Sequence, residues 1–163
     1  MKRWILIAWA LTLAVAGAGV IGKERLLARG DVVLLRLAPV DPRSLMQGDY
    51  MALNFAIGAP ILRALETTDD RIRTAVVRLD ARGEASFVRL HRGEPLVAGE
   101  HLLRFQLRPS RWGTDQVRIS TDAFFFQEGQ GRRYEGAQFG AFRVDGKGQA
   151  LLVELRDAEG HPL

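Results

Sequence analysis

Cysteine is absent from the 163-residue sequence, which excludes disulfide scaffolds, cysteine-ligated zinc, iron–sulfur clusters and thiol catalysis. Histidine is scarce, and its three residues lack the close spacing that a zinc site uses. Glycine and proline follow no repeating period, which excludes a collagen-like chain. No nucleophile stands in a G-x-S-x-G elbow. We therefore expect no metal and no cofactor, and the sequence offers no catalytic residue.

The sequence also has only a small excess of positive over negative charge. The formal net charge is +4, but the basic residues Lys2 and Arg3 lie at the extreme N-terminus. The rest of the chain has 21 basic and 19 acidic residues, which are interspersed rather than grouped. A nucleic-acid-binding surface needs a basic stripe. The sequence therefore predicts no nucleic-acid partner.

Residues 4–22 are an uncharged apolar run. A helix of this length is about 28 Å long, close to the roughly 30 Å hydrocarbon core of a bilayer. Lys2 and Arg3 precede the run, and basic residues at this position favour a cytoplasmic N-terminus. The rest of the chain is then expected outside the cytoplasm, in the periplasm or at the cell exterior. Residues 24–29 extend the predicted helix, and Gly30 is expected to end it.

Two interpretations of this apolar run remain open. Small residues at Ala14, Ala16 and Ala18 fit the cleavage pattern of a secretory signal peptide. The apolar stretch continues through Val20 and Ile21, beyond both cleavage positions, which favours an uncleaved anchor. We therefore divide the chain into a signal anchor or transmembrane helix, residues 1–22, and an exported β-rich domain, residues 23–163. The expected location is the cytoplasmic membrane, crossed once.

The exported part consists of short apolar runs separated by turn residues about every 8 to 12 positions, as in all-β domains. We expect a mainly β fold, with one antiparallel sandwich or barrel-like domain and one or two short helices. The sequence from Asp145 to Gly148 is a strong hairpin signal, and the last six residues are expected to be frayed. The predicted strands are residues 32–37, 49–57, 74–80, 84–92, 100–108, 117–120, 123–127, 138–144 and 149–156, with helical turns at residues 60–66 and 132–137.

The segment 49–57 alternates most clearly. Met51, Leu53, Phe55 and Ile57 fall on one face, which predicts a half-buried strand. Tyr50 falls on the other face, where an aromatic ring covers a second core or contacts a partner. In a purely structural interpretation, Gly48 and Asp49 form the turn that enters this strand.

The stretch from Gly48 to Phe55, GDYMALNF, resembles the signature of the GDYXXLXY family of bacterial membrane-anchored proteins of uncharacterised function. Phe55 stands where the signature has tyrosine, so one hydroxyl is missing. Residues 39–43 and the distal segment 125–134 are also similar to the family. The resemblance implies a single N-terminal hydrophobic segment and a multi-pass membrane protein as partner.

These segments supply the candidate binding residues, and two functional hypotheses follow. In the first, the protein is a non-enzymatic accessory domain that binds a multi-pass membrane protein. In the second, it is a ligand-binding or hydrolytic domain that acts on an envelope component through Asp49 and Glu128. The candidate residues are Gly48, Asp49, Tyr50, Leu53, Phe55, Glu128, Gly129 and Tyr134.

Overall fold

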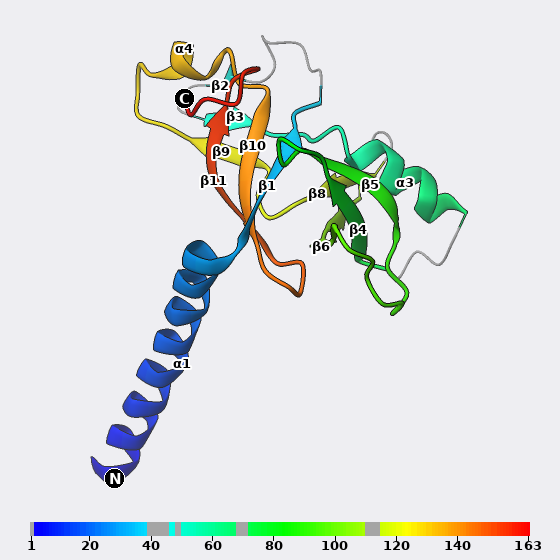
Figure 1. Ribbon diagram of the computed structural model, residues 1–163. Helices are drawn as coiled ribbons and strands as arrows, with labels where there is room; N and C mark the ends of the chain where they lie inside the picture. The colour runs from blue at the N-terminus through cyan, green and yellow to red at the C-terminus, as the bar shows by residue number, and fades with distance from the viewer. Residues whose placement is uncertain (1, 39–45, 48–49, 68–71, 110–114) are drawn as a thin grey trace.

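A long helix projects from one side of a domain that is built mainly from short antiparallel strands (Figure 1). The computed structural model describes residues 2–38, 46–47, 50–67, 72–109 and 115–163. The helices are α1 (Lys2–Arg29), α3 (Gly58–Glu66) and α4 (Gly131–Tyr134). The strands are β1 (Asp31–Arg36), β2 (Met46–Gln47), β3 (Tyr50–Ala52), β4 (Thr74–Leu79), β5 (Ala85–Leu90), β6 (Glu100–Arg104), β7 (Gln106–Arg108), β8 (Gln116–Arg118), β9 (Ala123–Phe125), β10 (Phe139–Val144) and β11 (Ala150–Arg156).

Helix α1 contains the whole apolar run and continues, as expected, to Arg29. It is long and apolar enough to cross a membrane, and none of its most apolar stretch is buried against the domain. The helix ends where Gly30 N donates a hydrogen bond to Leu26 O over 2.9 Å. Gly30 is needed for space: an added Cβ would lie 2.6 Å from Leu26 O and 3.1 Å from the Val144 backbone. The end of α1 therefore lies directly against β10.

Within the described residues the strands form small antiparallel sheets, and none of these sheets closes into a barrel. Their orders are β1–β10–β11, β2–β3–β9 and β5–β4–β6, and β7 pairs with β8. A parallel bridge from Leu34 to Glu84 joins the first of these sheets to the β4–β5 hairpin, with Leu34 N donating to Gly83 O over 2.8 Å. The prediction of a mainly β, antiparallel domain with short helices is confirmed.

Apolar side chains from the sheets and α3 meet in one main core. Helix α3 directs Ile61 and Leu65 into it, four residues apart on one helix face. On β10, the Phe142 ring meets the Phe55 ring edge-on, with 5.3 Å between centroids. The largest fully buried side chains are Val33, Leu35, Ile61, Val76, Val77, Leu103, Ile119, Phe142, Val144 and Leu155.

Two predicted strands are shorter in the structure because the chain changes partner within each. Strand β3 ends at Ala52, and the chain then turns to β1, where Phe55 bridges Leu37. The burial pattern of the alternation still holds, since Leu53 and Phe55 are buried and Asn54 is exposed. The predicted strand 100–108 likewise divides into β6, which pairs with β4, and β7, which pairs with β8.

One type of turn, Asp-x-x-Gly, joins β10 to β11. Asp145 Oδ1 accepts hydrogen bonds from Lys147 N at 2.9 Å and Gln149 N at 2.8 Å. Gly148 has φ 79°, a conformation that glycine adopts without steric strain. The same pattern recurs after β4 and after β11, at residues 80–84 and 157–161.

The last of these turns folds the C-terminus back onto β11. Asp157 Oδ1 accepts from Glu159 N and His161 N, and Leu163 N donates to Leu155 O over 3.0 Å. The expectation of a frayed C-terminus is therefore wrong, because the tail forms a hairpin whose turn carries its own hydrogen bonds.

Candidate functional site

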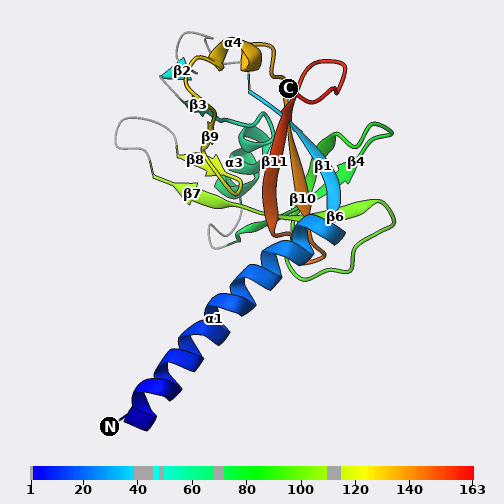
Figure 2. The same cartoon turned by 90° about the vertical axis from the view of Figure 1, so that its left-hand side faces the viewer.

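The two distinctive sequence segments lie side by side in one sheet. Strand β3 pairs antiparallel with β9, so residues 50–52 lie opposite residues 123–125. These strands are far apart in the sequence and adjacent in space, near α4 (Figure 2). The sheet therefore brings the distal segment against the segment that contains Tyr50.

The outer face of this sheet carries two neighbouring aromatic residues, Tyr50 and Phe125, of which Phe125 is exposed. The two residues lie opposite each other in the register, with ring centroids 5.8 Å apart and an angle of 41° between the ring planes. Phe125 is 74% exposed, a large fraction for a phenylalanine in a folded domain. Tyr50 is half-buried. We call these two residues the aromatic pair.

The inner face of the same sheet is core. Tyr134, from α4, is 8% exposed and lies between two phenylalanine rings. Its centroid is 5.1 Å from that of Phe124, edge-on, and 5.2 Å from that of Phe126, stacked. The Arg133 guanidinium carbon lies 5.9 Å from the Tyr134 ring centre. Tyr134 therefore packs α4 against the inner face of β9 and does not present its ring to solvent.

Two further candidates, Leu53 and Phe55, are also core residues. Phe55 packs against Phe142, and its ring approaches the Gly140 backbone so closely that an added Cβ there would lie 3.0 Å from it. An apolar ring suits this position because a buried hydroxyl needs a hydrogen-bond partner.

The remaining candidates lie at turns. Glu128 and Gly129 are exposed in the turn between β9 and α4, where Gln130 N donates to Gln127 O over 3.0 Å. Gly129 has φ 81°, as expected for a tight turn. Gly48 and Asp49 lie outside the described residues, so a pairing of Asp49 with Glu128 stays a prediction.

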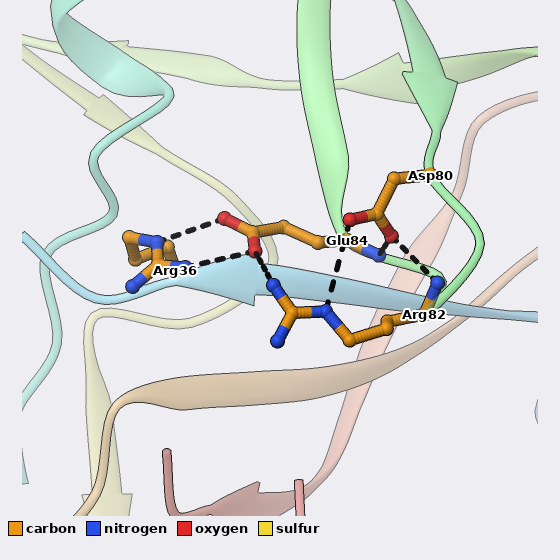
Figure 3. A network of polar contacts seen from close by, with 4 residues as sticks. All are labelled: Arg36, Asp80, Arg82 and Glu84. Carbon is orange, nitrogen blue, oxygen red and sulfur yellow. Dashed lines mark hydrogen bonds and ion pairs between the residues drawn. The ribbon is translucent and has the colours of Figure 1, made fainter. Parts of the chain in front are cut away.

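A polar network fastens β1 to the β4–β5 hairpin (Figure 3). Arg36 donates two hydrogen bonds to the Glu84 carboxylate, at 2.8 and 2.9 Å, and these raise the pKa of Arg36. The Arg36 guanidinium carbon also lies 4.6 Å from the Phe139 ring centre. The backbone N–H groups of Glu84 and Arg82 lower the pKa of Asp80. Since every carboxylate in the network is engaged, the network stabilises the junction of the sheets.

Glu100 is a buried carboxylate at the start of β6, with a side chain only 3% exposed. Arg89 Nη1 donates to it over 2.7 Å and Val97 N over 3.1 Å, and these bonds, in that order, lower its pKa. Arg78 Nη2 lies 3.5 Å from Glu100 Oε1, the oxygen that accepts the hydrogen bond from Arg89. A buried carboxylate with these partners stays ionised and ties β5 to β6, which is a structural role.

Metal ligation finds no support in the described part of the chain, where no three His, Asp or Glu side chains gather. The histidines are separate, and each faces a single carboxylate. His91 Nδ1 lies 3.7 Å from Glu94, His101 Nδ1 lies 3.4 Å from Asp31, and His161 Nδ1 lies 3.4 Å from Asp157.

Comparison with known proteins gives one result. The family model described as GDYXXLXY protein matches residues 12–155, which is most of the chain. No curated protein and no solved structure matches the chain.

Proposed function

The chain belongs to the GDYXXLXY family, and from this premise we propose that it is a membrane-anchored, non-enzymatic accessory domain that binds a multi-pass membrane protein. The observation that carries the proposal is the aromatic pair. It lies on the outer face of the sheet in which the segment that contains Tyr50 pairs with the start of the distal segment.

Helix α1 supports the membrane part of this proposal. Its apolar residues are exposed on all sides, and exposure to water of so much apolar surface is unfavourable, whereas a bilayer accommodates it. The apolar stretch continues through Val20 and Ile21, beyond both candidate cleavage positions. We therefore favour an anchor over a removable signal peptide. With Lys2 and Arg3 on the cytoplasmic side, the domain faces the periplasm or the cell exterior.

The aromatic pair supports the partner part. Tyrosine and phenylalanine are enriched at the centres of protein interfaces, where a ring adds much contact area at a small entropic cost. Phe125 leaves three quarters of its surface in solvent, although the neighbouring Phe124 and Phe126 turn inward. A partner that covers Phe125 gains the free energy of that burial, about 2 kcal/mol.

Hydrolysis through Glu128 is less well supported. A general acid or base needs a pKa near the working pH, which enzymes obtain by burying the group or crowding it with charge. Glu128 is exposed in a surface turn. We therefore propose an interaction domain rather than an enzyme.

Photo-crosslinking tests this proposal. A photoreactive amino acid replaces Phe125 in the full-length protein, which is expressed in its own membrane with the products of the neighbouring genes. The matched control carries the same group at Val153, a 47% exposed apolar residue on β11. We expect a discrete adduct with a multi-pass membrane protein from position 125 and none from position 153. Adducts from both positions, or from neither, would refute the assignment of this face.

A substitution pair tests the same surface without a crosslinker. Phe125→Ala is expected to reduce co-purification of the partner, whereas Val153→Ala leaves it unchanged. If Phe125→Ala co-purifies the partner at the wild-type level, the aromatic pair is not the binding surface.

A further inference from the structure

Arginine side chains line a cavity of about 680 Å³ where β6, β7 and β8 meet the β10–β11 hairpin. We call it the arginine pocket. Arg73, Arg104 and Arg118 contribute to its wall, together with Phe105 and Gln149. None of the described residues that line it is acidic.

The charge of Arg118 is only partly offset by its described neighbours. Arg118 donates to Gln106 and lies 3.8 Å from Asp122. Asp122 is more closely engaged by Arg108, at 2.5 Å. Around Arg118, one carboxylate is therefore shared between two guanidinium groups.

Each arginine is held by a structured backbone. Arg104 ends β6, and its N–H donates to Gly148 O over 2.8 Å, which fixes it to the hairpin turn. Arg73 lies just before β4 and donates from Nη1 to Ile72 O. The wall also includes Phe105, which is buried and apolar.

Ser120 adds a second unusual feature to the same wall. It has φ 61°, a left-handed conformation that is unfavourable for a residue other than glycine. Backbone strain of this kind is frequent at binding sites, where the surrounding structure maintains it. Guanidinium groups bind phosphate oxygens through paired hydrogen bonds, and a hydroxyl on the wall offers one more.

The arginine pocket lies beside the β10–β11 hairpin, which also meets the end of α1. It shares the β10–β11 hairpin with α1: Gln149 and Ala150 line the pocket, whereas residues 144–146, across the turn, line a cavity of about 390 Å³ with Arg25 and Arg29. Arg143 Nη1 donates to Gly30 O over 2.9 Å, which locks the hairpin to the helix end. Figure 2 shows the end of α1 close to β6 and β10.

We propose that the arginine pocket binds the phosphate of an anionic phospholipid headgroup from the membrane that holds α1. Headgroup phosphates form the polar layer just beyond the hydrocarbon core, and α1 enters that layer near Lys23. Basic side chains near a membrane surface are attracted to anionic lipids. The lipid would orient the domain against the bilayer, independently of any partner at the aromatic pair.

Titration of the full-length protein in an uncharged detergent tests this proposal. The probes are dihexanoyl phosphatidylglycerol, dihexanoyl phosphatidylcholine and inorganic phosphate, and calorimetry measures each affinity. We expect saturable binding of phosphatidylglycerol that weakens with salt, and at least about tenfold weaker binding of the other two. Equal affinity for phosphatidylcholine would overturn the proposal. Equal affinity for inorganic phosphate would overturn the lipid assignment and identify a soluble phosphate as the ligand.

A matched pair of charge reversals locates the site. Arg104→Glu is expected to weaken binding of phosphatidylglycerol at least about tenfold, because it replaces an attractive charge with a repulsive one. Arg63→Glu makes the same charge change on the exposed face of α3 and should leave the affinity within about twofold. Arg104→Gln, which is gentler on folding, should weaken binding by a smaller factor. Equal losses for Arg104→Glu and Arg63→Glu would show that only net charge matters and would overturn the pocket.

Discussion

Gly148 provides the sharpest test of how the domain is held together. An added Cβ at this position would lie 3.0 Å from both Leu102 C and Leu102 Cβ, and 3.1 Å from Arg104 N. Most of these atoms are backbone and cannot turn aside. The φ of 79° adds a left-handed strain of about 1–2 kcal/mol for alanine. Crowding in a packed region costs about another 1–2 kcal/mol.

Gly148→Ala is therefore expected to lower the free energy of unfolding by about 2–4 kcal/mol. Thermal unfolding of the full-length protein in detergent, followed by near-UV circular dichroism, measures this loss. For a domain of this size we expect Tm to fall by roughly 6–20 °C. The same change should loosen the arginine pocket, since Gly148 O accepts the hydrogen bond from Arg104 N.

Gly146→Ala is the matched control, two residues away in the same turn. Nothing lies within 4 Å of an added Cβ at Gly146, and its φ is not positive. We expect Tm to stay unchanged or to rise slightly, since alanine restricts the unfolded chain by about 0.4–1 kcal/mol. Equal Tm values for the two variants would refute the reasoning, because then neither the backbone conformation nor the close approach of β6 limits the turn.

Four further measurements probe other parts of the structure. Phe142→Ala should lower the free energy of unfolding by about 3–5 kcal/mol in denaturant titration, since the ring is fully buried against Phe55. Thermal unfolding should separate Phe124→Ala, which removes an inward ring and costs about 2–4 kcal/mol, from Phe125→Ala, which changes stability by less than about 0.5 kcal/mol. The lowered pKa of Glu100 means that its stabilisation is present above the usual carboxyl pKa, near 4, and is lost as the pH falls through the folded value, so Glu100→Gln should flatten the fall of Tm in acid. Asp157→Ala should speed amide hydrogen exchange at residues 159–163, and unchanged exchange there would show that this carboxylate does not hold the tail.

Sequence analysis predicted the helices and turns whose formation depends on residues close together in the chain. The helix over the apolar run, its end at Gly30 and the hairpin at residues 145–148 each depend on a few consecutive positions, and the structure confirms these three elements. The two predicted strands that the structure divides could not be resolved in the same way, since their alternation continues unchanged through the points where the chain changes partner. A change of pairing partner depends on distant strands, which periodicity does not reveal.

The C-terminal tail was predictable from a pattern within the chain. The spacing of Asp145 and Gly148 recurs at Asp157 and Gly160, and both turns form the same hydrogen bonds. A comparison of these two segments would have predicted the final turn. Only six residues follow Asp157, too few to form the alternating run that indicates a returning strand.

The candidate site was predictable only in outline. The resemblance pointed to Tyr50 and to the distal segment, and the structure places them in one sheet. It could not show that Tyr134 lies in the core while Phe125 lies outside, because that depends on which face of β9 meets α4. The arginine pocket was invisible to sequence analysis, since Arg73, Arg104 and Arg118 are widely spaced along the chain.

The junction at Gly30 has a mechanical consequence. A single residue separates α1 from β1, and Arg143 on β10 donates a hydrogen bond to its carbonyl oxygen, so no linker lies between the helix and the domain. In the anchored form that we propose, any tilt or axial rotation of α1 within the bilayer swings the whole β domain through the same angle. The domain then stays close to the membrane surface, and its orientation depends on the orientation of α1 in the bilayer.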